Sequence, residues 1–66
     1  MATNVQDARE LSGASPKELV RLLFQWTECQ VIMEERGHLK YAVLYRKAAR
    51  QVGMEILNRI EQGEWP

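Results

Sequence analysis

Two helical segments joined by a very short connection account for most of this 66-residue chain. The first begins at the S-P-K-E sequence of residues 15–18. The Ser15 hydroxyl can accept from the backbone N–H of Glu18, and the Glu18 carboxylate can accept from the N–H of Ser15. Pro16 occupies the first helical position, where its missing N–H removes no hydrogen bond. We therefore predict a helix over about 16–36.

Glycines end both segments. Gly37 follows the first helix and can adopt the left-handed conformation that closes it, and Gly63 can do the same after a second helix over about 39–62. Because the connection at Gly37 and His38 is short, the helices should fold back on each other as an αα-hairpin. The domain organisation that follows is a flexible N-terminal arm at 1–14, a helical hairpin at 15–63 and a C-terminal tail at 64–66.

The first helix is apolar over more of its circumference than one neighbour can cover. At about 100° per residue, its main stripe has the alternating three- and four-residue spacing of a helix-bundle seam. A second apolar strip lies about 100° away, so the helix needs two neighbours. The main stripe consists of Leu19, Leu22, Trp26, Cys29 and Met33, and the second strip of Val20, Phe24 and Val31.

The second helix has a stripe of smaller side chains. Gly53 lies in it, although glycine within a helix costs roughly 1 kcal/mol relative to alanine. A close helix crossing against Trp26 or Phe24 is the natural explanation for Gly53. The stripe consists of Ala42, Tyr45, Ala49, Gly53 or its neighbour Val52, Ile56 and Ile60.

A chain of this size has a small core, roughly 3–5 kcal/mol of stability, unless a disulfide, a metal or oligomerisation adds to it. Cys29 is the only cysteine and His38 the only histidine, so neither an intrachain disulfide nor a cysteine–histidine metal cluster can form. Oligomerisation is therefore the remaining source of added stability. We predict an all-α fold: a two-helix antiparallel hairpin that dimerises into a four-helix bundle.

The net charge is zero, but the charges are sorted along the chain. Residues 1–35 carry minus three, residues 36–54 carry plus five with no acid, and residues 55–66 carry minus two. A basic belt at residues 36–50 therefore spans the hairpin tip and the start of the second helix. It can face acids of the first helix or of a second subunit, or it can bind an anionic partner surface.

Nothing in the sequence indicates catalysis. Cys29 lies in an apolar seam, where cysteine behaves as a small hydrophobe, and His38 lies in the connection. We expect no enzyme, cofactor or metal. The lone thiol, with no signal peptide and no run of about 20 apolar residues, predicts a cytoplasmic protein that does not enter a membrane.

Apolar residues left over after the seams are filled predict a binding surface for another protein. We interpret the chain as a small non-catalytic regulator, of inhibitor, anti-activator or chaperone type, that occupies a surface of a larger partner. Trp65 can alternatively pack against Leu11 or onto the open end of the hairpin. The predicted anchors are Phe24, Val31, Leu44 and Trp65, with Arg46, Lys47 and Arg50 guiding approach.

Two other functions remain open. The basic belt, with Tyr41 and Tyr45 among its cations, is compatible with a nucleic-acid-associated transcriptional regulator. The neutral overall charge favours protein binding over this alternative. A structural subunit of a larger assembly is the third possibility.

Residues 14–23, A-S-P-K-E-L-V-R-L-L, resemble the opening of the flagellin export chaperone family, in which an A-S-P-x-x-L segment begins the first helix of a bundle. The resemblance covers about ten residues of the 66. It implies a helix start at this point, and we carry no function over from it.

Overall fold

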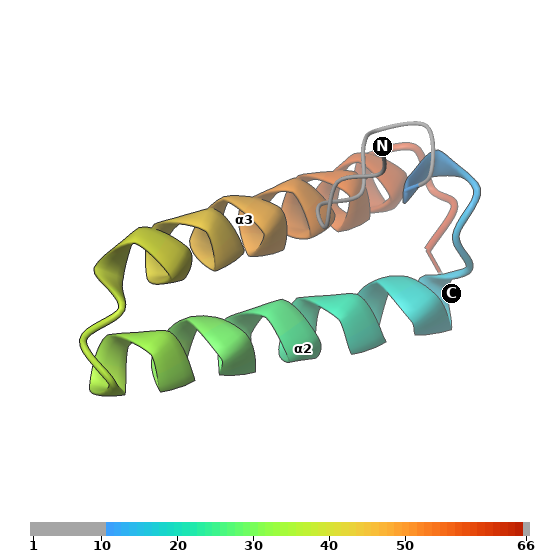
Figure 1. The fold of residues 1–66 in the computed structure, drawn as a ribbon. Coiled ribbons are helices and arrows are strands. Elements are labelled where there is room, and N and C mark those ends of the chain that lie inside the picture. Colours follow the sequence, from blue (N-terminus) through green and yellow to red (C-terminus); the bar gives the residue numbers. More distant parts are fainter. Residues whose placement is uncertain (1–10, 66) are drawn as a thin grey trace.

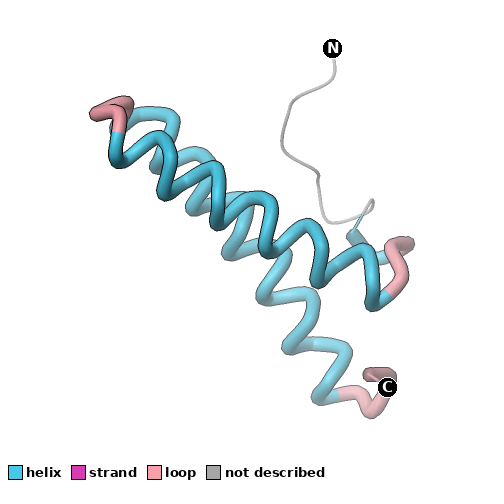
Figure 2. Tube along the Cα trace, turned by 90° about the horizontal axis from the view of Figure 1, so that it is seen from below, coloured by secondary structure: helices cyan, strands magenta, loops and turns pink. Residues whose placement is uncertain are grey.

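The computed structural model describes residues 11–65 and shows an antiparallel helical hairpin (Figure 1). Helix α2 spans Pro16–Glu35 and helix α3 spans Leu39–Glu61. The predicted all-α hairpin is therefore confirmed. Figure 2 shows that the helices lie together at the connection and diverge toward their other ends.

The capping box at the start of α2 forms as predicted. The Ser15 N–H donates to the Glu18 carboxylate at 2.8 Å, and the Glu18 N–H donates to the Ser15 hydroxyl at 3.2 Å. The bond from the Ser15 N–H is the main cause that lowers the pKa of the Glu18 carboxyl below its usual value; the Ser15 hydroxyl near the carboxylate lowers it further, and Arg21 adds a small attraction. The anionic side chain also suits the positive end of the helix dipole.

The end of α2 shows why the connection can be so short. Gly37 has φ 79°, its N–H donates to the Glu34 carbonyl at 3.1 Å, and the His38 N–H donates to the Met33 carbonyl at 2.8 Å. This pair of bonds is the Schellman arrangement, which needs a left-handed residue and satisfies carbonyls that the helix leaves free. It also turns the chain directly into α3.

The end of α3 repeats this geometry. Gly63 has φ 73°, and the N–H groups of Gly63 and Glu64 donate to the carbonyls of Ile60 and Arg59, at 3.1 and 2.9 Å. Both predicted glycine stops are confirmed. The predicted helices were one residue too long, because Arg36 and Gln62 are the capping residues that follow them.

The described core is small and lies toward the open end of the hairpin. Its centre consists of Leu11, Leu19 and Val52, which come from three different segments. Nearer the tip, the rings of Trp26 and Tyr45 stack with centroids 5.6 Å apart. Alanines fill the rest of the buried α3 surface, and larger side chains line the edge of the central cluster. The buried alanines are Ala42, Ala48 and Ala49, and the edge residues include Leu22, Leu23, Trp26, Ile56 and Trp65.

Helix α3 is rotated relative to the prediction. Ala48 and Val52 are buried, whereas Ile60, predicted in the hairpin or dimer core, is 50% exposed in the hairpin. The predicted close crossing of Gly53 against Trp26 or Phe24 does not occur within the hairpin, because a Cβ atom placed there has no neighbouring heavy atom within 4 Å. The side of α3 that contains Tyr45, Ala48 and Val52 faces the interior instead, so Gly53 borders open space.

The other residues of the predicted core have mixed outcomes. On α2, Leu19 is fully buried, while the rest of the main stripe is half-buried because α3 covers only one side of it. The half-buried set consists of Leu22, Trp26, Cys29 and Met33 on α2 and of Tyr45, Gly53 and Ile56 on α3.

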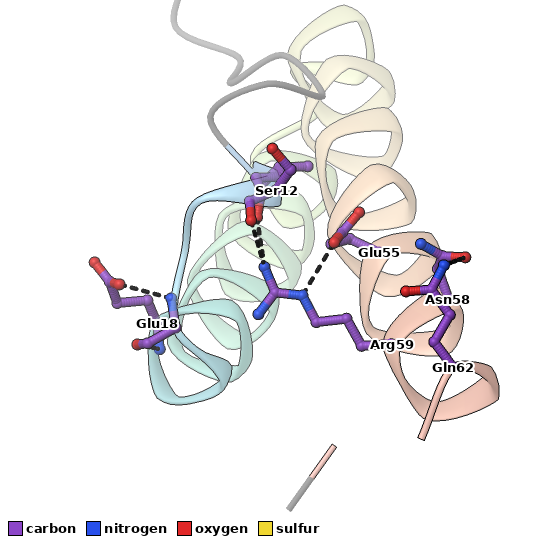
Figure 3. A network of polar contacts seen from close by, with 8 residues as sticks. Ser12, Glu18, Glu55, Asn58, Arg59 and Gln62 are labelled. Carbon is purple, nitrogen blue, oxygen red and sulfur yellow. Dashed lines mark hydrogen bonds and ion pairs between the residues drawn. The ribbon is translucent and has the colours of Figure 1, made fainter. Parts of the chain in front are cut away.

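The segment before α2 is fastened to the hairpin by Arg59 (Figure 3). Arg59 Nη2 donates to the carbonyls of Leu11 and Ser12, both at 3.0 Å, and Nε pairs with Glu55 at 3.0 Å. Leu11 is only 3% exposed. The last residues of the predicted N-terminal arm therefore belong to the hairpin, and residues 1–10 lie outside the described part of the chain.

Candidate protein-binding surface

A large apolar surface remains uncovered on the outer side of α2. Phe24 is 72% exposed, and it lines a shallow groove with Val31 and Ile32. Thr27 and Glu28 complete the groove. These residues follow Phe24 by three, four, seven and eight positions, so they share one face of the helix. The sequence thus places two predicted anchors, Phe24 and Val31, in the same groove.

A second uncovered surface lies on α3. Several large apolar side chains of this helix are exposed, and the hairpin has only a small core. Near the tip, Leu39, Val43 and Arg46 line a groove together with Gln30 and Glu34 of α2, so this surface extends onto the first helix. The exposed apolar residues of this face are Leu39, Val43, Leu57 and Ile60.

The predicted basic residues lie on the outward side of α3. Arg46, Lys47 and Arg50 are all exposed, and Arg50 lines a further groove with Met54. Leu11 forms another part of that groove's wall. Because Arg46 and Lys47 precede Arg50 by four and three residues, the three cations are neighbours on the helix surface.

Two predicted anchors lie away from the α2 groove. Leu44 is exposed on α3 and does not line the groove that Phe24 and Val31 share. Trp65 is half-buried and packs against the cluster of Leu11, Leu19 and Val52. Trp65 therefore folds back onto the open end of the hairpin, which is the alternative that the sequence left open.

The sequence did not indicate the roles of two residues. Leu39 was expected beside the core stripe but is 64% exposed, and Arg59, for which no role was expected, is buried. The spacing of Glu55 and Arg59, four residues apart, indicates an ion pair on one helix face. Nothing in the sequence indicates that the Arg59 guanidinium would also donate hydrogen bonds to the carbonyls of Leu11 and Ser12.

The single cysteine and the single histidine of the sequence both lie within the described residues. Cys29 is a free, half-buried thiol, and the His38 ring packs edge-on against Tyr41 with centroids 6.4 Å apart. Within residues 11–65, no three histidine, cysteine or acidic side chains gather in a way that could hold a metal ion. Neither α2 nor α3 is long and apolar enough to cross a membrane.

Comparisons with known proteins do not add a relative. No family model, no curated protein sequence and no solved structure matches this chain.

Proposed function

We propose that this chain is a small non-catalytic regulator that binds a larger protein through the outer groove of α2. The observation that supports the proposal is the exposure of Phe24 beside Val31 and Ile32, on a face that α3 does not cover. Contiguous exposed apolar residues on a folded domain mark interaction sites more often than chance. An aromatic side chain at the centre of such a patch is a typical energetic anchor.

The second part of the proposal is that the hairpin works as a homodimer arranged as a four-helix bundle. The Cα trace is only 15 Å thick along its shortest axis, which is one layer of helices. Helices that are apolar beyond a single stripe need neighbours on more than one side. Most of the buried α3 residues are alanines, so the single hairpin has little apolar surface in its interior. A second hairpin supplies the missing layer.

Affinity capture with matched variants tests the binding surface. The immobilised protein, its Phe24→Ala variant and a Leu44→Ala control are exposed to extract of the source cells, with and without nuclease. Leu44 is a suitable control because it is also an exposed apolar residue on a helix but does not line the α2 groove. We expect a protein that is retained by the parent and the control, lost with Phe24→Ala, and insensitive to nuclease. Equal retention by all three proteins contradicts the proposed site.

Nucleic-acid binding is the second candidate, and the charge pattern of α3 favours it. Lys40, Arg46, Lys47 and Arg50 are exposed, and no acid occurs between Arg36 and Met54. Phosphate contacts of this kind give an affinity that falls steeply with salt. Reversing Arg46, Lys47 and Arg50 to glutamate separates the two functions. Under the protein-binding proposal this variant mainly slows association at low salt, whereas a nucleic-acid binder loses its affinity and is indifferent to Phe24→Ala.

A further inference from the structure

The face of α3 that contains Gly53 has no partner within the hairpin. Leu57 and Ile60, which follow Gly53 by one and two helical turns, are 49% and 50% exposed. Gly53 itself has open space where a side chain would stand. Glycine in the middle of a helix is destabilising, and no contact within the hairpin accounts for it. Among residues 11–65, this face is therefore apolar, small at its centre and only about half covered.

The charges on α3 are arranged oppositely on the two sides of Gly53. The helix carries four cations before Gly53 and, apart from the internal pair of Glu55 and Arg59, only Glu61 after it. Arg46 precedes Gly53 by two turns, and Glu61 follows it by slightly more than two turns. On the Gly53 side of the helix, Arg46 and Arg50 precede Gly53 and Glu61 follows it, so this side is complementary to a copy of itself that runs in the opposite direction. The cations before Gly53 are Lys40, Arg46, Lys47 and Arg50.

We propose that the occupant of this face is a second copy of the chain, with the two α3 helices crossing antiparallel at Gly53. The inference rests on the proposed self-association and specifies which helix forms the interface and in which direction. A two-fold axis beside Gly53 makes the interface isologous, so each contact occurs twice. It brings Arg46 of each copy next to Glu61 of the other.

The packing that follows is sterically consistent with the hairpin. Residues at equal distances before and after Gly53 meet across a two-fold crossing, so residue 60 of one copy lies opposite residue 46 of the other. Ile60 lies against the methylene stem of Arg46 of the other copy, which keeps its charged end in water. The missing side chain of Gly53 allows the backbones to approach at the crossing point. A parallel pair would instead place Arg46 and Arg50, which lie on the Gly53 side of the helix, beside their own copies, which is repulsive.

A charge at the crossing point tests the interface. In Gly53→Arg the hairpin has room for the new side chain, and arginine is a better helix former than glycine. The added cation enters an interface already flanked by Arg46 and Arg50, so we expect the dimer dissociation constant to rise at least about tenfold. Gly53→Ala is the comparison variant: it adds one methyl group at the crossing and no charge, so it should raise the dissociation constant less than Gly53→Arg does. Sedimentation equilibrium gives the masses, and circular dichroism shows that each variant is folded.

Disulfide mapping tests the direction of the helices. With Cys29 replaced by serine, an Arg46→Cys protein and an Ile60→Cys protein are mixed and oxidised with glutathione disulfide. The antiparallel crossing predicts the mixed product that joins residue 46 to residue 60, and a parallel pair predicts products that join like to like. A parent protein that stays monomeric at millimolar concentration overturns self-association altogether. A dimer that tolerates Gly53→Arg, or that yields like-to-like products, overturns only this interface.

Discussion

Arg59 should be the most sensitive polar residue of the described hairpin. Replacing it with methionine keeps an unbranched apolar stem of similar length but removes every hydrogen-bond donor. Two bonds from Nη2, at 3.0 Å to the carbonyls of Leu11 and Ser12, are lost, and so is the ion pair with Glu55. The substitution thus releases the segment before α2, whose Leu11 side chain packs against Leu19 and Val52.

The magnitude follows from burial. The Arg59 side chain is 11% exposed and that of Glu55 is 20% exposed, so water screens these contacts only in part. Hydrogen bonds to a charged group contribute about 1.5–3 kcal/mol each, while the Leu11 carbonyl keeps its bond from the Ala14 N–H at 3.1 Å. The methionine stem retains most of the apolar contact. We expect a net loss of roughly 2–4 kcal/mol in the free energy of unfolding, a large share of what so small a core supplies.

Urea unfolding followed by far-ultraviolet circular dichroism measures this loss, at one fixed protein concentration because association adds to apparent stability. Glu55→Gln is the matched control: it removes the ion pair but leaves the two carbonyl bonds, and we expect it to cost under about 1 kcal/mol. Arg59→Lys should fall between the two, since an ammonium group lacks the planar fork that reaches both sides. If the free energy of unfolding of Arg59→Met lies within about 0.5 kcal/mol of the parent value, the proposed role of the Arg59 contacts is refuted.

Three further predictions concern α2. Ser15→Ala removes the N-cap acceptor and should lower the free energy of unfolding by about 1 kcal/mol, measured by urea denaturation. The lowered pKa of Glu18 means that its contribution is complete above the pKa of the unfolded chain and is lost as the pH falls through the folded value, so Glu18→Gln should flatten the acid side of a melting-temperature profile against pH. Leu19, with no exposed surface, should cost about 2–4 kcal/mol when replaced by alanine, and an exposed-site control such as Leu44→Ala should cost far less.

The helix ends could be predicted from the sequence because each depends on a few neighbouring residues. Ser15, Pro16 and Glu18 form a capping box wherever a helix begins at that point. Gly37 and Gly63 are free of the steric penalty that other residues meet in the left-handed conformation. These local rules, with the short connection between them, define the hairpin before any tertiary contact is considered.

The rotation of α3 about its axis could not be predicted in the same way. Alanines at 42, 48 and 49 give the helix small apolar surface on two adjacent sides, so its periodicity alone does not choose between them. The choice is made by contacts with the segment before α2. Leu11 packs beside Val52, and the guanidinium of Arg59 bonds to the chain before α2, which places that side of α3 inward. Such long-range contacts leave no periodic signal.

This rotation has a consequence for association. By turning its alanines inward, α3 leaves Leu39, Leu57 and Ile60 about half exposed or more. Fully burying a leucine or isoleucine side chain contributes about 1.5–3 kcal/mol, so completing the burial of each should contribute on the order of 1 kcal/mol. Leu57 and Ile60, buried in both copies of the antiparallel pair, offer a driving force comparable with the stability of a single small core. Folding and association of this chain should therefore be coupled, with a melting temperature that rises with protein concentration. Gly53→Arg should remove the dependence of the melting temperature on protein concentration while the helices remain. The reason is that Gly53 has no neighbour in the hairpin and lies at the centre of the surface that association would cover.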